Sequence, residues 1–494
     1  MKDDVAPKPS AGSLFLTVFP SIMLPMFLAV VDQTIVATAL PAIAATLGNV
    51  ERVSWVVVAY LVATTIAAPV YGQLRDVYGG RPMMFAALGI FLVSSLLCAM
   101  SVSVEMLTVA RILQGLGGGG LMTLSQALIG ETIPPRERAR YQGYLAGVMV
   151  TSSTFGPVVG GLLTQHFGWR SVFLINLPLG LAAVALTLRL EPRPGRNQPW
   201  TFDTMGLVLF IAFIGPLLFA LEQAQRMRAG MLPGFALLMG IAFAALLALV
   251  LREKRAIYPL LPIHLLRQAT IWRSDALAAC HGATLVSLIT FLPIYLRVLR
   301  GASASETGLL LLPLMFGIGA GSMVTGRIVS RTGRTMIFPA VGLMVATVCL
   351  LLLAAFAGSL GMWQLGVYLF FSGVFMGTVM GVVQVTVQNA AGTTSLGSAA
   401  ASVQLSRSIG AAVGTALVGT VLFAALALSD PGSAPLFATL VQQGPVAIQD
   451  LTAERQAVIL AEVAVAFRAA FLTVAAFAGI GMALAWSIPM RRLT

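Results

Sequence analysis

Apolar runs of about 18 or more residues recur from one end of this 494-residue chain to the other, and this pattern limits the fold more than any other feature. A helical run of that length crosses the ~30 Å hydrocarbon core of a bilayer at about 1.5 Å per residue. Runs such as "ALLALVL" lack the alternation of a membrane-spanning strand. With 58% hydrophobic and 10% charged residues, the chain is predicted to be an all-α integral membrane protein.

Breaks that are charged or rich in Gly and Pro divide the chain into fourteen predicted membrane-spanning helices. They cover residues 14–44, 53–73, 83–101, 105–128, 139–164, 171–189, 204–222, 232–251, 275–297, 305–329, 335–358, 361–388, 399–426 and 465–488. The stretch 427–464 is too polar to span and too long for a tight turn, so we expect a long outer loop with a short amphipathic helix. The first run is too long for a signal-peptide core, so helix 1 is expected to be retained.

The positive charges predict the orientation. Most of the 30 lysines and arginines fall in one set of alternating loops, which the positive-inside rule assigns to the cytoplasm. With an even number of helices, both termini are predicted to be cytoplasmic. Because the net charge of +12 follows this topology, nucleic acid is not an expected partner. The three cysteines are dispersed in apolar segments, so we predict no metal site and no cofactor.

An internal repeat divides the chain into two halves. "GQLRDVYGGR" after helix 2 and "GRIVSRTGRT" after helix 10 carry glycine at equivalent positions, 72 and 79 in the first and 326 and 333 in the second. Paired six-helix halves suggest a transporter with its site between them. The predicted parts are a six-helix bundle at 1–190, a linker with two inserted helices at 191–272, and a second six-helix bundle at 273–494.

Five motifs resemble those of the major facilitator superfamily, in its fourteen-helix drug:proton antiporter branch. They are "DQTIVATALP", "GQLRDVYGGRP", "LTVARILQGLGGG", "SSTFGPVVGGLL" and "GWRSVFLINLPLG", in the right order and on the right helices. The second departs from the family pattern, because Val77 and Gly80 stand where arginine is common. The resemblance implies two six-helix bundles with two inserted helices, and proton-coupled export of amphipathic, often cationic toxic compounds by alternating access.

Asp32 lies well inside helix 1, where a charge must face a partner or a wet cavity. Burial disfavours the ionised carboxylate, so Asp32 can exchange a proton. Arg111 in helix 4 lies at a similar predicted depth and needs an anion or carbonyl groups. We expect the two to be coupled: Arg111 stabilises ionised Asp32, and a proton is taken up when substrate or a conformational change separates them. A permanent packing salt bridge is the alternative.

Two motifs are expected to contribute to gating. In helix 5, Pro157 breaks the hydrogen-bond ladder, and small residues offer a thin face for another helix; these are Gly156, Gly160 and Gly161. Simple close packing without motion explains this pattern equally well. In the loop after helix 2, Asp76 could cap a neighbouring helix or pair with Arg81, near Gly72. The resemblance implies that this loop latches the two halves in one state. A solvated loop with positive-inside charges is the alternative, and it explains the arginines but not the glycine spacing.

Other polar and aromatic groups are further candidates. Glu222, Asp275 and His281 could share the proton with Asp32, and Arg407 could bond carbonyl groups or line the cavity. The alternatives are a structural role for His281 and a position at the membrane interface for Glu222 and Asp275. The predicted substrate pocket consists of Gln33, Trp55, Tyr60, Gln114, Phe291 and Tyr295, whose aromatic members could stack on flat cations. Packing or an interfacial aromatic belt is the competing interpretation of these aromatic residues.

Enzymatic classes are disfavoured. No lysine stands in a phosphate-binding loop, no histidine stands in H-E-x-x-H, and no exposed stretch is large enough for a soluble catalytic site. The leading hypothesis is a proton-coupled multidrug efflux transporter in the bacterial plasma membrane, working as a monomer on small drugs, protons and surrounding lipid. Export of an endogenous lipid, siderophore or metabolite is the alternative, as is a sensor that transports nothing. An accessory protein on the outer face is left open.

Overall fold

The computed structural model describes residues 11–48, 52–191, 201–224, 232–261, 263–429, 437, 439–441 and 451–492. Within these ranges the regular secondary structure is helical, apart from an isolated bridge between Arg334 and Arg492, and turns and loops connect the helices. The helices are α1 (Ala11–Leu47), α2 (Trp55–Tyr78), α3 (Gly80–Ala99), α4 (Val104–Thr132), α5 (Pro135–Phe167), α6 (Ser171–Leu174), α7 (Asn176–Thr187), α8 (Thr204–Ala224), α9 (Leu232–Glu253), α10 (Ile263–Leu266), α11 (Ala269–Arg300), α12 (Ala304–Thr332), α13 (Ile337–Phe356), α14 (Met362–Met376), α15 (Met380–Ala391), η2 (Thr393–Ser395), α16 (Leu396–Ser429) and α18 (Ala453–Ser487).

Twelve segments of the described chain are long and apolar enough to cross a membrane. Each coincides with one of the fourteen predicted helices. The two remaining predictions fall on α4, which carries Arg111 and a run of glycines, and on α6 and α7, which together form a shorter apolar stretch at 171–187. An all-helical membrane fold is therefore confirmed, with twelve segments that meet the criteria for spanning on length and composition.

The helix boundaries correct the prediction at one end of the outer loop. We expected the last helix to start at residue 465, but α18 begins at Ala453. Thr452 caps it by accepting a hydrogen bond from the backbone N–H of Arg455 at 3.4 Å, and residues 456–466 contain no Gly or Pro that would interrupt a helix. Part of the predicted loop, at 430–436, 438 and 442–450, lies outside the described residues.

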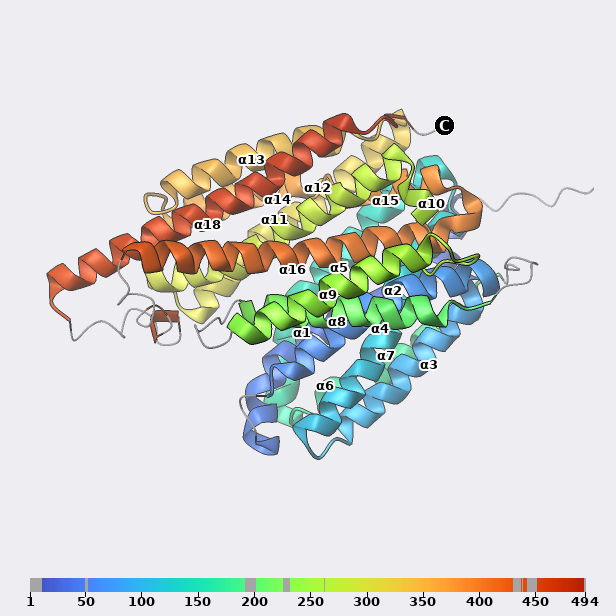
Figure 1. Cartoon of the computed structure of the whole chain (residues 1–494), viewed down its shortest axis with the longest axis horizontal. Coiled ribbons are helices and arrows are strands. Elements are labelled where there is room, and N and C mark those ends of the chain that lie inside the picture. The colour runs from blue at the N-terminus through green and yellow to red at the C-terminus, as the bar shows by residue number, and fades with distance from the viewer. Residues whose placement is uncertain are drawn as a thin grey trace, which may run out of the picture. The chain divides into compact units, whose positions relative to one another are not determined.

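The chain forms two compact units. The first contains residues 1–134, 151–200 and 394–401, and the second contains residues 135–150, 201–393 and 402–494. In the first unit, α4 packs against α1, α2 and α3, and α7 packs against α1 and α3 (Figure 1). The core of this unit includes Val56, Leu107 and Phe173, all fully buried.

Glycines allow α4 to approach its neighbours closely. A Cβ at Gly117 would lie 2.7 Å from the backbone nitrogen of Phe91 in α3, and a Cβ at Gly119 would lie 2.8 Å from Cα of Thr64 in α2. Such distances are possible only without a side chain. The glycine run of the fourth helix therefore sets how closely α4 lies to the two helices that flank it.

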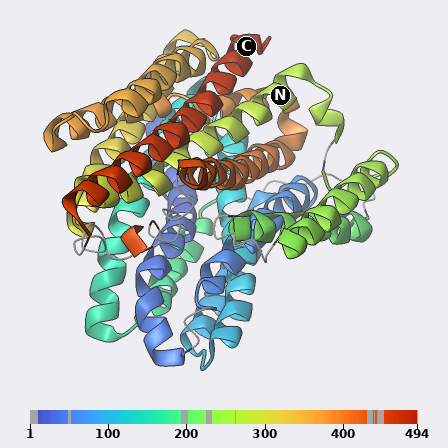
Figure 2. The same ribbon diagram turned by 60° about the vertical axis from the view of Figure 1, so that its left-hand side comes forward.

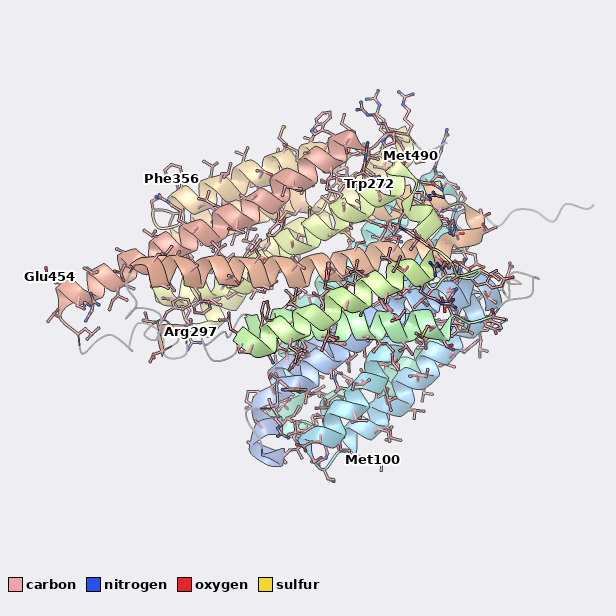
Figure 3. The ribbon with its side chains drawn as sticks, viewed as in Figure 1. Met100, Trp272, Arg297, Phe356, Glu454 and Met490 are labelled. Atoms are coloured by element: carbon pink, nitrogen blue, oxygen red, sulfur yellow. The ribbon has the colours of Figure 1, made fainter. Side chains whose placement is uncertain are left out.

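In the second unit, α11 and α18 pack together and run in opposite directions. Figure 3 shows Trp272 and Met490 at one end of this pair, and Arg297 and Glu454 at the other. Helix α13 also packs on α18, and α12 packs on α14. The helices α8 and α9, predicted as the inserted pair, lie side by side as a hairpin (Figure 2).

Gly117→Ala is expected to lower the free energy of unfolding by about 1–3 kcal/mol, because the added Cβ overlaps the backbone of α3. Gly89→Ala is the matched control: it also changes a glycine inside a helix of the first unit, but its Cβ would have no atom within 4 Å. Thermal unfolding of the purified protein in detergent measures both variants. Equal melting temperatures would contradict the close packing of α3 on α4.

Candidate functional site

Asp32 and Arg111 form a buried ion pair in the first unit. Arg111 Nη1 donates to Asp32 Oδ2 at 2.5 Å, and both side chains are 0% exposed. The pair joins the middle of α1 to the first third of α4. The contact that the two sequence positions predicted is therefore present. Breaking one side of such a pair leaves an uncompensated buried charge, which is strongly unfavourable.

Two side-chain amides complete the hydrogen bonds of the Asp32 carboxylate. Gln114 Nε2 and Asn176 Nδ2 both donate to Asp32 Oδ1, at 2.9 and 2.8 Å. Ser95 Oγ accepts from the same two amides, at 2.8 and 3.3 Å. Three N–H donors thus surround Asp32, which is the arrangement that an ionised carboxylate requires. The site brings together side chains from α1, α3, α4 and α7.

Aromatic rings enclose the Arg111 guanidinium. Its Cζ lies 4.1 Å from the ring centroid of Tyr60 and 5.9 Å from that of Phe173, and Nε donates to the Val56 carbonyl at 3.3 Å. The Tyr60 hydroxyl donates to the Ala29 carbonyl at 3.1 Å. Stacking and carbonyl contacts stabilise a desolvated arginine, so this shell holds Arg111 against Asp32.

The predicted substrate pocket is therefore only partly accessible. Tyr60 and Gln114 are fully buried in the ion-pair cluster, so the expected stacking of a ligand on Tyr60 is not available in this structure. In the second unit Phe291 and Tyr295 are also buried, and the Tyr295 ring packs at 5.5 Å against both Phe467 and Phe471. Of the six predicted residues, Trp55 is 47% exposed and Gln33 is half-buried.

Asp76 caps the N-terminus of α16, whose first turns belong to the first unit. Its Oδ1 accepts from the backbone N–H of Gly397 at 2.9 Å, and its Oδ2 accepts from the backbone N–H and the hydroxyl of Ser398 at 3.0 and 2.8 Å. The carboxylate satisfies free N–H groups at the positive end of the helix dipole. A Cβ at Gly72 would lie 2.7 Å from the Gly397 carbonyl oxygen, so Gly72 permits this approach.

The basic partner of Asp76 differs from the prediction. Arg75 Nη1 donates to Asp76 Oδ1 at 2.8 Å, and Arg75 Nη2 donates to Glu131 Oε2 at 2.5 Å. Arg81, which we expected as the alternative partner, donates to the Leu188 carbonyl at 3.1 Å. Arg75 is the closer arginine because it precedes Asp76 on the same helix, whereas Arg81 follows the turn at Gly79 and lies on α3.

The second copy of the repeat has glycines at the same positions as the first, but it has no acid at the position of the capping residue Asp76. Gly79 ends α2 at φ 91° and Gly333 ends α12 at φ 68°, so both copies leave the helix through a backbone conformation that favours glycine. Ser330 stands where the first copy has Asp76, and its hydroxyl donates to the Arg327 carbonyl of its own helix at 2.9 Å.

The glycines of α5 contact α1 two to six residues beyond Asp32. A Cβ at Gly156 would overlap Thr34, and a Cβ at Gly160 would lie 2.8 Å from the Ile35 carbonyl oxygen. Pro157 lies between them on an exposed face of the continuous helix. Gly161 was expected on the same thin face, but nothing lies within 4 Å of its Cβ position, since it points away from α1.

The ionisable candidates of the second unit do not form one cluster. Asp275 is buried and accepts from Ser402 Oγ at 3.4 Å, and His281 is buried with Nε2 3.1 Å from the Met376 carbonyl. Arg407 donates to Gln404 at 3.2 Å. Glu222 is half-buried near the end of α8. No group of three or more potential metal-ligating side chains occurs among the described residues.

Four of the contributing residues were missed by the sequence analysis. Asn176 and Ser95 bind the carboxylate or its amides, and Arg75 and Glu131 support Asp76. Asn176 could have been found by the rule that selected Asp32, because it is the only polar residue in "FLINLPLG". The Ser95 contact depends on which face of α3 meets α4, which no local pattern specifies.

Asp76→Ala is expected to cost about 0.5–2 kcal/mol, because the first N–H groups of α16 lose their acceptor. Hydrogen exchange at the Gly397 and Ser398 amides should become faster. Ser330→Ala is the matched control, since its hydroxyl bonds only its own helix. Unchanged exchange at Gly397 and Ser398 in the Asp76 variant would contradict the cap.

Comparisons with known proteins identify the family of the chain. A family model described as Major Facilitator Superfamily matches residues 22–415. The multidrug transporter protein MdtP of Bacillus subtilis is 30% identical over 426 residues, covering 85% of this chain and 77% of that protein. An uncharacterized MFS-type transporter of Mycobacterium tuberculosis is 33% identical over 405 residues, covering 81% of this chain and 58% of its own length. The chain thus spans less than two thirds of that relative.

Solved structures support the fold. The human organic anion transporter MFSD10 superposes with a TM-score of 0.63 at 15% identity, covering 97% of this chain and all of that one. The proton:xylose symporter XylE also gives a TM-score of 0.63, at 14% identity and 98% coverage of both chains. These similarities concern the fold alone. Together with the family match over most of the sequence, they show that the chain belongs to the major facilitator superfamily.

Proposed function

We propose that this protein is a secondary active transporter that exports amphipathic, often cationic toxic compounds in exchange for protons. The observation that carries the proposal is the Asp32–Arg111 pair, with 2.5 Å between its atoms and both side chains 0% exposed. The name of MdtP, a multidrug transporter, supports the substrate class. No part of the proposed exchange requires a covalent intermediate, so we propose a transporter and not an enzyme.

The exchange of a proton for a cationic substrate at Asp32 follows from electrostatics. While Arg111 contacts Asp32, the guanidinium supplies the positive charge that balances the carboxylate, and no further cation is needed. A conformational change that parts α4 from α1 removes this compensation, and a buried carboxylate without a cation must gain one or become neutral. A proton or a cationic substrate satisfies that requirement, but not both together. Competition for one carboxylate gives antiport.

We further propose the finer topology. Helix α4, and α6 with α7, would complete fourteen spans around the twelve that meet the length and composition criteria. By the positive-inside rule, loops rich in arginine lie on the cytoplasmic side of a membrane. Arg334, Arg491 and Arg492 lie at one end of the second unit, where the Thr335 N–H donates to the Arg491 carbonyl at 3.0 Å. That end would be cytoplasmic, as would both termini, in a bacterial plasma membrane.

Two contacts would support gating. The bonds from the α16 N-terminus to Asp76 would hold one state closed, and the seam of Gly156 and Gly160 against α1 would let α5 move without opening a void. We propose that the parts predicted at 1–190, 191–272 and 273–494 act as two bundles and an inserted pair. The protein would work as a monomer within the lipid.

Asp32→Asn is expected to abolish export driven by an imposed pH gradient, because the amide cannot take up a proton. Proteoliposomes loaded with ethidium and given an inward proton gradient measure this as efflux at the rate of protein-free vesicles. Glu105→Gln is the control: it neutralises an exposed acid on α4, paired with Arg52 at 3.4 Å, and export should be unchanged.

A double variant separates loss of coupling from loss of folding. Asp32→Asn alone leaves Arg111 buried without its anion, which should lower the free energy of unfolding by about 3–5 kcal/mol. Asp32→Asn combined with Arg111→Gln removes both charges and should recover most of that stability. The double variant is expected to fold and still fail in pH-driven efflux. Proton-driven export by either variant at the wild-type rate would refute the role of Asp32.

A further inference from the structure

Asn176 holds an unusual position beside the ion pair. It is the first residue of α7, directly after Ile175 separates α6 from α7, and it is 1% exposed. Its Nδ2 donates to Asp32 Oδ1 at 2.8 Å and to Ser95 Oγ at 3.3 Å. Its side-chain carbonyl is buried and has no hydrogen-bond partner among the described residues. A buried carbonyl without a partner is unfavourable, so the arrangement needs a reason.

The neighbouring amide, Gln114, is fixed by contrast. Its Nε2 donates to Asp32 and Ser95, and its Oε1 accepts from Arg111 Nη1 at 2.7 Å and from Cys98 Sγ at 3.4 Å. Turning this amide over would break the bond to Arg111 and direct N–H groups at the guanidinium. Of the two amides on the carboxylate, only that of Asn176 can turn without losing a bond made by its carbonyl.

We propose that Asn176 is a positioning residue that changes its hydrogen-bond role with the protonation of Asp32. Its N–H donates to the ionised carboxylate, and after the amide turns over, its carbonyl accepts the O–H of the protonated acid. The proton passes between Asp32 and water, so that one O–H bond forms on the carboxyl group as one breaks on hydronium, and no other covalent bond changes. Asn176 thereby keeps α7 attached to α1 in both states. This inference rests on the proposed role of Asp32 in proton exchange.

The other charged and titratable groups around Asp32 are already engaged, so the change of hydrogen-bond role falls to Asn176. From α4 the facing charged group is Arg111, from α2 the titratable group is Tyr60, and from α3 it is Cys98, while α6 and α7 contribute none. The Tyr60 hydroxyl donates to a backbone carbonyl and the Cys98 thiol donates to Gln114. Arg111 can only donate, so it cannot accept a hydrogen bond from the O–H of the neutral acid.

Infrared difference spectroscopy tests the change of role on the full-length protein in lipid nanodiscs, without any transport. The carboxylic acid band that Asp32→Asn removes reports the protonation of Asp32. Asparagine labelled with ¹³C at its side-chain carbonyl reports the amide, and because the chain has four asparagines, Asn176→Leu assigns the band of interest. The labelled carbonyl band should shift at the pH at which Asp32 takes up its proton. A band that stays constant through that titration overturns the proposal.

The same spectra give a quantitative prediction for the variant. Asn176→Leu removes a bond to the charged form and a weaker one to the neutral form, so the protonation midpoint of Asp32 should rise by about one pH unit. Asn176→Ser keeps a hydroxyl that can donate or accept and should shift the midpoint less, which also provides a second variant if the leucine variant does not fold. A midpoint that is unchanged or lower in both variants contradicts the inference.

Thr187→Val is the matched control, because Thr187 is a fully buried polar residue of the same helix whose hydroxyl donates to its own Ala183 carbonyl at 2.7 Å. Its midpoint should equal that of the wild type. The two proposals fail separately: export by Asp32→Asn refutes the transport role, whereas a constant amide band with a titrating Asp32 refutes only the role of Asn176.

Discussion

A pair of opposite charges sealed away from water is the constraint around which the first unit is organised. Desolvating Asp32 and Arg111 is costly, and their attraction repays the cost only when the remaining donors and acceptors are also satisfied. The structure meets most of this demand with groups from several helices: the amides of Gln114 and Asn176, the Val56 carbonyl and the Tyr60 ring. Packing of α1, α2, α4 and α7 in the first unit therefore depends on one ion pair, and displacement of any of these helices changes its energy.

Glycine positions explain how the helices come close enough for such a cluster. Gly117 and Gly119 remove the side chains that would separate α4 from α3 and α2, and Gly156 and Gly160 do the same for α5 against α1 just beyond Asp32. In a membrane, where apolar surface drives little association between helices, backbone contact and polar bonds have to hold the bundle together. Close contact of this kind also permits sliding, because it is not locked by interdigitating side chains.

The sequence predicted the features that depend on local physics. Long apolar runs predicted the helices, an acid and a base at similar depth predicted the pair of Asp32 with Arg111, and the position of Asp76 predicted the cap of a helix. Features that depend on helix rotation were wrong or missed. Gly161 points away from α1, the Tyr60 ring packs against Arg111, and Arg75 replaces Arg81 beside Asp76. Which face of a helix meets its neighbour is decided by the whole bundle, and hydropathy cannot specify it when the helix is apolar all round.

The role of Asp32 can be tested by proton release on substrate binding. Purified protein in a weakly buffered detergent solution is mixed with a permanent cation such as ethidium, and the pH change is recorded across neutral pH for the wild type and for Asp32→Asn. If substrate and proton compete for one carboxylate, the wild type releases protons in proportion to the bound cation, and the variant releases none. Equal proton release by the variant would show that the exchanged proton resides elsewhere and would contradict this account.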